Sequence, residues 1–546
     1  MSSPSFLRIP PFPGHRAAPL AIPGRPHETH KAASAGSVVE ALKRYKVGGT
    51  FWGGEHSLPA GKSVILAASS PKAAEACVAL AREAGLLDRA VFVGGSTTTS
   101  GIPSLPAGGD PWFLCAAATH VIASADDEIA LVAAILEVPL SIIGEGRFAA
   151  LADPSVLEGV VARELCDQWR YRDPFDGSEI DAVAAITMLG RWRALIDANR
   201  PVGTVHGIAR WKRVTADNLL WAGTGSVPHD RKVFAGNQAL AWISRSDQAA
   251  LAALKANRIP IGEIEDGMIR STGLGANCVP PLSIVVDTLG PHFDPAQASM
   301  LETILETAEI DEATIARAAA LRERLVQAGI SKYEHDSVRS ITDRATGNDG
   351  QRKVLVTGQV EDDRSVLSGG AGLGNLELLR RARAHEPDAT IVFKPHPDVE
   401  AGHRKGHVPD AQAREYADEI DRTSSIASLL DQVDAVHVLT SLAGFEALMR
   451  HREVVTHGVP FYAGWGLTRD LVQVPARRTR RRTLDELVAA TLLLYPRYLD
   501  PVTRLPCEAE VLVDRIAAGQ TRIRTPLIVL REWLGRLNRL LGRRNS

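Results

Sequence analysis

Two groups of acidic residues follow apolar segments and could carry acid–base chemistry. Glu265 and Asp266 precede a glycine, and the segment 358–365 contains three consecutive acids. Neighbouring carboxylates raise one another's pKa, so either group could supply a general acid or base, and the second group could supply a nucleophile. Arg270 could bind the carboxylate of an acidic sugar through a two-pronged contact. The alternatives are a solvated surface loop and, for the three acids, a divalent-metal site.

Two further loops contain residue types that bind phosphate. Lys394 and His396 follow a predicted strand, and ligands of open α/β sheets bind beyond the carboxyl ends of strands. Thr440 and Ser441 open a predicted helix, whose first turn offers N–H groups and a positive dipole end. The alternatives are a rigid turn with an exposed histidine and an ordinary N-cap serine.

Two residues inside that predicted helix complete the second loop. Gly444 would permit close approach of a ligand, and Glu446 could accept hydrogen bonds from a ribose. Each loop alone is a weak signal, but two such loops on adjacent strands are much less frequent by chance.

Strand and helix patterns alternate along the chain and would position these loops. Short apolar runs are expected to form strands at 63–69, 90–95, 119–124, 138–144, 353–359, 389–397, 434–441 and 453–460. Helical patterns separate them, which predicts βαβ units and parallel sheets. The region between the two sets alternates as well, so we expect an α/β fold in which two Rossmann-like domains face each other across a cleft.

The first and last parts of the chain predict a duplicated module. THVIASADDEIAL, from Thr119, parallels VHVLTSLAGFEAL, from Val436, and the YRDP segment at Tyr171 parallels YLDP at Tyr498. The period is too long for a solenoid, so we expect two copies of an enzyme module, the first shortened.

The composition excludes several classes of protein. The chain has 546 residues, which favours more than one domain, and a net charge of -2 argues against a protein that coats nucleic acid. The five cysteines include no CxxC pair, and no run approaches the roughly 18 apolar residues of a membrane span. The N-terminus is proline-rich and has no apolar secretory core. We therefore expect a flexible tail and a cytoplasmic location.

The segment 526–546 predicts a helix on an anionic membrane surface. Leucines and Trp533 share one helical face, and arginines flank or oppose it. This pattern is typical of an interfacial helix, so we expect peripheral attachment to the inner membrane. The alternative is a helix docked on the protein's own core.

Together these segments resemble the capsule-type retaining β-Kdo transferases. WKR, EDGMIRSTGLGAN, PPLSIVVD, GQVEDDRS, KPHPDVEAG, TSLAGFEAL, GVPFYAGWGLT and LYPRYLDPVT occur in this order and at about family spacing, over 207–503. The resemblance implies GT-B-like architecture, a CMP-β-Kdo donor, a capsule-type, lipid-linked glycan acceptor, and a double displacement that retains the anomeric configuration. It implies no metal and no cofactor.

Carried over position by position, the resemblance implies a role for each candidate residue. Asp363 matches the nucleophile, and Glu265, with Asp266 beside it, matches the general acid/base. His396 and Ser441 match ligands of the CMP phosphate. The other expected residues bind the donor (Lys394, Thr440, Gly444 and Glu446) or position the Kdo carboxylate (Arg270, Gln359 and Ser365).

The first copy departs from the family where a phosphate would bind. Asp126, Asp127 and Glu128 stand where the second copy has the start of LAGFEA, and acids there would repel a phosphate. We therefore expect one active site. The expected domains are a flexible tail (1–60), a degenerate and structural half-module (61–203), an acceptor-side catalytic domain (204–348), a CMP-sugar-binding domain (349–497), crossing helices (498–525) and the basic amphipathic helix (526–546).

Two other functions fit parts of the pattern. Other CMP-sugar transferases, such as sialyltransferases, share the EDG and HP elements but lack RSTGLGAN, PPLSIVVD and FYAGWGLT. A catalytically inactive partner in capsule assembly or export is the alternative outside enzymes. Against it, every candidate catalytic residue is present in the second copy.

Overall fold

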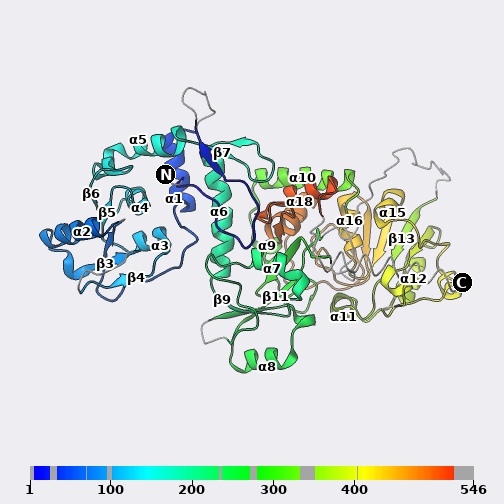
Figure 1. The fold of residues 1–546 in the computed structure, drawn as a ribbon. Helices are drawn as coiled ribbons and strands as arrows, with labels where there is room; N and C mark the ends of the chain where they lie inside the picture. The colour runs from blue at the N-terminus through cyan, green and yellow to red at the C-terminus, as the bar shows by residue number, and fades with distance from the viewer. Residues whose placement is uncertain are drawn as a thin grey trace, which may run out of the picture. The chain divides into compact units, whose positions relative to one another are not determined.

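A computed structural model of the chain describes residues 5–24, 33–68, 70–94, 101–232, 237–270, 279–331, 351–402 and 404–521. Within them the chain forms two units (Figure 1). Unit 1 takes its described residues from Met1–Val202, Leu220–Val227 and Thr503–Leu505, and unit 2 from Gly203–Leu219, Pro228–Val502 and Pro506–Ser546. Both units contain sheets connected by helices, which confirms the predicted α/β class.

Unit 1 contains a parallel sheet with the strand order β4-β3-β2-β5-β6. Its strands are β2 (Val64–Ala67), β3 (Ala90–Val93), β4 (Ser104–Leu105), β5 (His120–Ser124) and β6 (Leu140–Ile143). Strand β2 is buried along its whole length, as continuous apolar runs are when helices cover both faces of a sheet. The connecting helices include α2 (Pro71–Glu83), α3 (Pro111–Ala116) and α4 (Glu128–Ile135). The strands predicted in the first copy are confirmed, with shorter bounds.

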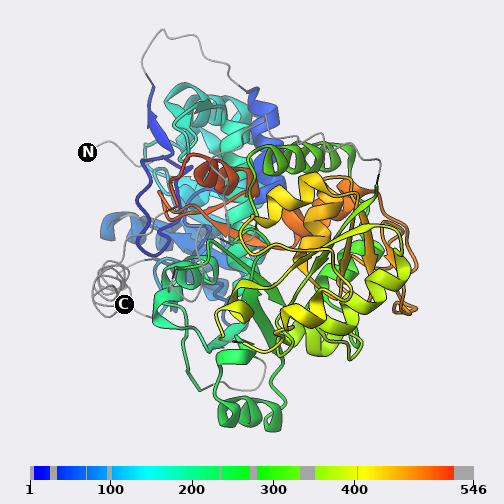
Figure 2. The same ribbon diagram turned by 90° about the vertical axis from the view of Figure 1, so that its right-hand side faces the viewer.

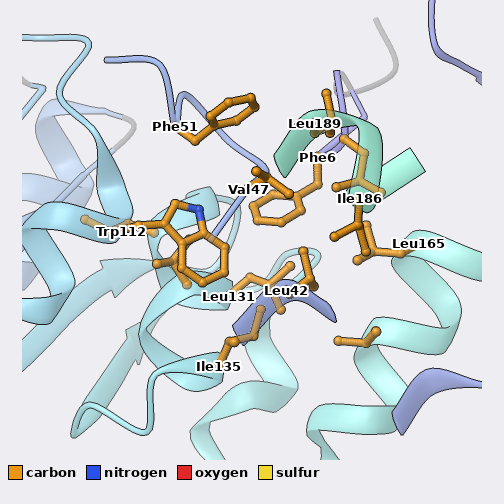
Figure 3. Close-up of a cluster of buried hydrophobic side chains, with 14 of the residues drawn as sticks. Phe6, Leu42, Val47, Phe51, Trp112, Leu131, Ile135, Leu165, Ile186 and Leu189 are labelled. Atoms are coloured by element: carbon orange, nitrogen blue, oxygen red, sulfur yellow. The ribbon is translucent and has the colours of Figure 1, made fainter. Parts of the chain in front are cut away.

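The N-terminal region is not the flexible tail that its proline content predicted. Phe6 and Leu7 are fully buried in the core of unit 1, and Phe6 lies among the side chains shown in Figure 3. Helix α1 (Ala35–Tyr45) packs into the same core, and strand β1 (Ala21–Pro23) pairs with β7 (Trp169–Arg172). Apolar side chains lie among the prolines, and the free energy gained by burying them outweighs the conformational entropy lost when the segment becomes ordered.

Unit 2 contains a second parallel sheet, which repeats the first. Its order is β15-β14-β13-β16-β17-β18, so β13 to β17 correspond one by one to β2 to β6. The strands are β13 (Lys353–Thr357), β14 (Thr390–Lys394), β15 (Glu419–Ile420), β16 (Ala435–Val438), β17 (Glu453–Thr456) and β18 (Arg469–Asp470). The strands predicted in the second copy are confirmed.

A matching pair of tyrosines supports the duplication outside the sheets. The Tyr171 hydroxyl donates at 2.9 Å to the carbonyl oxygen of Leu165, which belongs to the π-helix η4 (Ala162–Asp167). The Tyr498 hydroxyl donates at 2.7 Å to the carbonyl oxygen of Leu492, which belongs to the π-helix η8 (Ala489–Leu494). The same local structure therefore follows the sheet in both copies.

The other sheet of unit 2 is mixed, with the order β20-β19-β12-β11-β10-β9. Its strands are β9 (Val202–His206), β10 (Gln238–Ala241), β11 (Ile261–Asp266), β12 (Ser283–Asp287), β19 (Arg497–Leu499) and β20 (Pro506–Cys507). Strand β12 is antiparallel to both β11 and β19. The segment 498–525, predicted as crossing helices, instead contributes two strands and one helix in its described part.

That helix, α18 (Ala509–Ala517), lies beside α10 (Glu312–Gln327) in both views (Figure 1, Figure 2). Arg317 of α10 joins them through an ion pair of 2.6 Å with Glu508. The predicted surface helix at 526–546 lies outside the described residues. Among the helices that the structure describes, none combines the length and apolar character needed to cross a membrane.

Replacing Phe6 tests whether the N-terminal segment is part of the core. Phe6→Ala is expected to lower the free energy of unfolding of unit 1 by about 3–5 kcal/mol, because it removes a buried ring and leaves a cavity. Urea denaturation measures this. Arg16→Ala, an exposed position in the same segment, is the control and should change the free energy by less than about 0.5 kcal/mol. A flexible tail would give no loss in either variant.

Candidate active site

A cavity of about 670 Å³ lies in unit 2, where residues from both of its sheets meet. The mixed sheet contributes the end of β11, and the parallel sheet contributes the loops after β13, β14 and β16. The predicted residues that line the cavity are Glu265, Asp266, Arg270, Asp363, Lys394, His396, Ser441 and Glu446. Gln359, Ser365, Thr440 and Gly444 are not among its lining residues. The structure thus brings most of the predicted site into one place.

Glu265 shares an arginine with a second carboxylate. Glu263 and Glu265 lie two residues apart on β11, so their side chains point to the same face. Nη1 of Arg364 lies 3.1 Å from Glu265 Oε1, and the same guanidinium binds Glu263 through both of its terminal nitrogens. Burial, followed by the charge of Glu263, raises the pKa of Glu265 to about 7, against the opposing effect of Arg364. Glu265 can therefore accept or donate a proton near neutral pH.

Asp266 holds two cations at the other side of the strand end. Lys212 Nζ lies 3.2 Å from Asp266 Oδ1, and Arg270 Nε lies 2.8 Å from Asp266 Oδ2. Asp266 is therefore the counter-ion of two cations in this state. Arg270 is 1% exposed and also donates to the Val279 carbonyl oxygen at 3.0 Å, so its contacts hold it in the protein.

Lys212 is a cation of the cavity that the sequence reasoning missed. It ends the short helix η5 (Arg210–Lys212), and its Nζ lies 3.1 Å from the centre of the Trp242 ring. Burial lowers the pKa of Lys212 to about 8, and Asp266 opposes this effect. Trp211 and Trp242 also line the cavity. In the sequence, only the neighbouring Trp211 could have indicated that Lys212 is buried beside a ligand site.

Asp363 is held with one oxygen engaged. It is the N-cap of α11 (Arg364–Gly369), and its Oδ1 accepts hydrogen bonds from the Ser365 backbone N–H at 3.0 Å and the Ser365 hydroxyl at 2.7 Å. Capping fixes the carboxylate at the start of the helix. Both bonds go to Oδ1, so Oδ2 is the oxygen suited to attack. Ser365 thus positions Asp363 from outside the cavity lining.

His396 presents a neutral imidazole with a defined tautomer. It is the N-cap of α13 (Pro397–Glu400), and its Nδ1 accepts a hydrogen bond from the Asp398 N–H at 3.2 Å. Burial lowers the pKa of His396, so the neutral ring is favoured and its proton must be on Nε2. Lys394 ends β14, two residues earlier, and lines the same cavity. The ammonium group of Lys394 and the Nε2–H donor of His396 therefore line the same cavity.

Gln359 connects two loops and does not line the cavity. Its Oε1 accepts hydrogen bonds from the backbone N–H groups of Leu439 (3.1 Å), Thr440 (2.9 Å) and Ser441 (3.2 Å), and its Nε2 donates to Thr440 Oγ1 at 3.0 Å. The amide ties the loop after β13 to the loop that opens α16 (Leu442–Met449). Gln359 and Thr440 therefore build the site rather than face it.

Gly444 serves packing, which differs from the predicted close approach of a ligand. A Cβ atom at Gly444 would lie 2.2 Å from the Tyr462 hydroxyl oxygen and 2.7 Å from its Cζ. The same hydroxyl donates to the Ser441 carbonyl oxygen, so Tyr462 supports the start of α16. Glu446, one turn further along α16 from the N-cap, lines the cavity as a buried side chain.

Gly444→Ala tests this packing role. The added methyl group is expected to lower the free energy of unfolding by about 1–3 kcal/mol, measured by urea denaturation. The same change should cost less in a Tyr462→Phe background, because the nearest atom is gone.

Gly159→Ala is the matched control, since Gly159 is a helical glycine of α5 (Leu157–Val161) and nothing lies within 4 Å of the place that an added Cβ would take. It should be neutral or stabilising by up to about 1 kcal/mol. Undiminished stability of Gly444→Ala with weakened nucleotide binding would return Gly444 to the ligand site.

Comparisons with known proteins match this part of the chain. The sequence profile of a family described as "Capsule polysaccharide biosynthesis protein" matches residues 243–498. The capsule polysaccharide modification protein LipA of Neisseria meningitidis is 38% identical over 354 residues, which cover 62% of this chain and 49% of LipA. The lipopolysaccharide-processing protein LpsZ of Rhizobium meliloti is 42% identical over 243 residues, which cover 44% of this chain and 54% of LpsZ.

A solved structure is also similar. The β-Kdo 2,4 transferase of KpsC from Thermosulfurimonas dismutans has 30% sequence identity and a TM-score of 0.50, over 58% of this chain and 98% of that one. The chain spans about half the length of the curated relatives that it matches.

Proposed function

The chain belongs to the capsule polysaccharide biosynthesis family, and from this premise we propose that unit 2 is a retaining transferase that moves Kdo from CMP-β-Kdo to a glycan. One observation carries the proposal. Two carboxylates, Glu265 on β11 and Asp363 at the start of α11, line the same cavity as the phosphate-binding candidates Lys394, His396 and Ser441. A nucleotide-sugar transferase with a covalent intermediate needs these two groups together.

The donor's phosphate would lie against the loops after β14 and β16. His396 Nε2–H donates to it, Lys394 compensates its charge, and Ser441 adds a hydroxyl at the start of α16. These groups stabilise the negative charge that develops on the phosphate as the sugar leaves. Binding therefore serves both recognition of CMP and departure of the leaving group.

The transfer then takes two displacements. In the first, Oδ2 of Asp363 forms a bond to the anomeric carbon, the bond from that carbon to the phosphate oxygen breaks, and its electron pair leaves with CMP. In the second, an acceptor hydroxyl attacks the same carbon, the ester bond breaks, and its electron pair returns to Asp363. Glu265 takes the proton of that hydroxyl. Two inversions give net retention.

The acceptor in this proposal is a capsule-type glycan linked to lipid. A lipid-linked acceptor requires the enzyme to work at a membrane surface, which is the role we assign to the segment 526–546, on the cytoplasmic face of the inner membrane.

Unit 1 has a structural role in this proposal. Asp127 caps α4 through the Ile129 N–H, as Ser441 caps α16 through the Ala443 N–H. Its neighbours are engaged in the fold: Glu128 binds Arg8 at 2.7 Å, and Asp126 accepts from the Arg147 N–H at 3.0 Å. Negative charge at this helix start opposes phosphate binding.

Trapping the intermediate tests the nucleophile. With CMP-Kdo, a Glu265→Gln variant is expected to accumulate protein heavier by one Kdo residue, with the adduct on Asp363, as read by intact-protein and peptide mass spectrometry. Asp363→Asn should lose the adduct and lower turnover by several orders of magnitude.

Asp362→Asn is the matched control for this experiment. Asp362 is the adjacent carboxylate; it does not line the cavity and pairs, half-exposed, with Arg404 of the lining, so its loss should leave turnover within a few fold of the parent protein. An adduct on any other residue would overturn the assignment of Asp363.

Substitutions at His396 test the binding of the donor phosphate. His396→Ala and Ser441→Ala should each weaken CMP binding by about 1–3 kcal/mol in calorimetry, the range for a charge-assisted hydrogen bond. His396→Gln should recover part of the loss because its amide nitrogen is placed near the imidazole Nε2, whereas His396→Asn should not. His407→Ala, at an exposed histidine outside the cavity lining, is the control. Equal affinity in all variants would remove His396 from the donor site.

A further inference from the structure

Arg364 joins the two sheets of unit 2 at the cavity. It directly follows Asp363 and begins α11, and its guanidinium reaches Glu263 and Glu265 on β11 of the other sheet. The guanidinium also lies over the Phe293 ring, 4.9 Å from the ring centre. The arginine next to the proposed nucleophile therefore contacts the proposed proton-transfer group directly.

The two carboxylates share this arginine unequally. Glu263 is 9% exposed and accepts from both terminal nitrogens, including Nη2 at 3.2 Å from Oε2, whereas Glu265 is bound through Nη1 alone. The two-pronged contact is the stronger one, so Glu263 takes most of the arginine's charge. Glu265 is left oriented by the cation but only partly compensated.

We propose that Glu263 and Arg364 are positioning residues that fix the place of Glu265 and keep its proton exchangeable, and so couple the proton-transfer group of one sheet to the nucleophile of the other. The inference rests on the proposed function of Glu265. It gives a role to Glu263 and Arg364, which make and break no bond in that scheme.

Charged groups face Glu265 from each neighbouring element. They are Glu263 and Asp266 on β11, Arg364 at the start of α11 and Lys212 in η5, together with the ionisable Tyr495 in the segment after η8. Lys212 and Arg270 both bind Asp266, whereas Arg364 binds Glu265. Arg364 and Glu263 therefore act on Glu265 with opposite sign.

The signs of two substitutions follow. Glu263→Gln removes a negative charge and frees the guanidinium to bind Glu265 through two nitrogens, so the pKa of Glu265 should fall from about 7 by about 1 pH unit or more. Arg364→Gln removes the cation and leaves two adjacent buried carboxylates, so the pKa of Glu265 should rise. If Glu265 acts as a base, the pH at which transfer switches on should move down in the first variant and up in the second.

The test is a carbon-13 NMR titration of the full chain labelled at glutamate carboxyls, with Glu265 assigned by comparison with Glu265→Gln. The expected result is opposite movement in the two variants. Glu302→Gln is the matched control, because Glu302 is a buried glutamate held by Arg477 and Arg478 outside the cavity lining, and it should leave Glu265 unchanged. Arg364→Lys keeps a cation and should lie close to the parent protein.

A merely structural clamp gives a different result. Loosening would admit water and lower the pKa of Glu265 towards about 4.3 in both variants, which would overturn the inference. A shift of the Glu265 pKa in the same direction in both variants, or no shift in either, would also overturn the inference. The titration needs no sugar donor, so it is independent of the transferase assay. Opposite pKa shifts in a protein that releases no CMP from CMP-Kdo would support the positioning role and reject the transferase. Transfer activity without opposite shifts would reject the positioning role alone.

Discussion

The common edge of the parallel sheet is the constraint on which the site depends. Strands β13, β14 and β16 run parallel, so their carboxyl ends lie together, and each is followed by a loop that reaches the cavity. Gln359 then binds three successive N–H groups before α16 and fixes one loop against the other. Asp363, His396 and Ser441 each cap the helix that follows its strand. Backbone geometry thus places the chemical groups before any ligand arrives.

The same sheet in unit 1 shows how one topology supports different chemistry. The strand order, the π-helix and the tyrosine hydrogen bond recur in both units. In unit 1 the N-cap of the equivalent helix is Asp127, as Ser441 is the N-cap of α16, and the neighbouring Glu128 binds Arg8 of the N-terminal segment. The helix start that faces the cavity in one copy therefore serves the fold in the other, where the acids have structural partners.

Residue patterns predicted the strands and the loops after them, because buried strands appear as apolar runs and helix starts as capping residues in the local sequence. They did not predict contacts between distant residues. Arg364 reaches Glu263 and Glu265 from the start of α11, about 100 residues further along the chain, and Lys212 packs on Trp242, so neither role can be read from spacing. The packing of Gly444 could not be predicted for a related reason, because the atom closest to its missing side chain belongs to the distant Tyr462. The N-terminal segment was misread because proline content hid four buried apolar residues, Phe6, Leu7, Phe12 and Leu20.

The anomeric configuration of the product distinguishes double displacement through Asp363 from a single displacement. Asp363 and Glu265 at one cavity predict two displacements at the same carbon, and hence retention. The measurement is NMR of the product formed by the unaltered protein from CMP-β-Kdo, generated in situ, and a lipid-linked glycan acceptor. A β-linked Kdo residue is the expected product. An α-linked product would mean a single displacement without a covalent intermediate, and would contradict it.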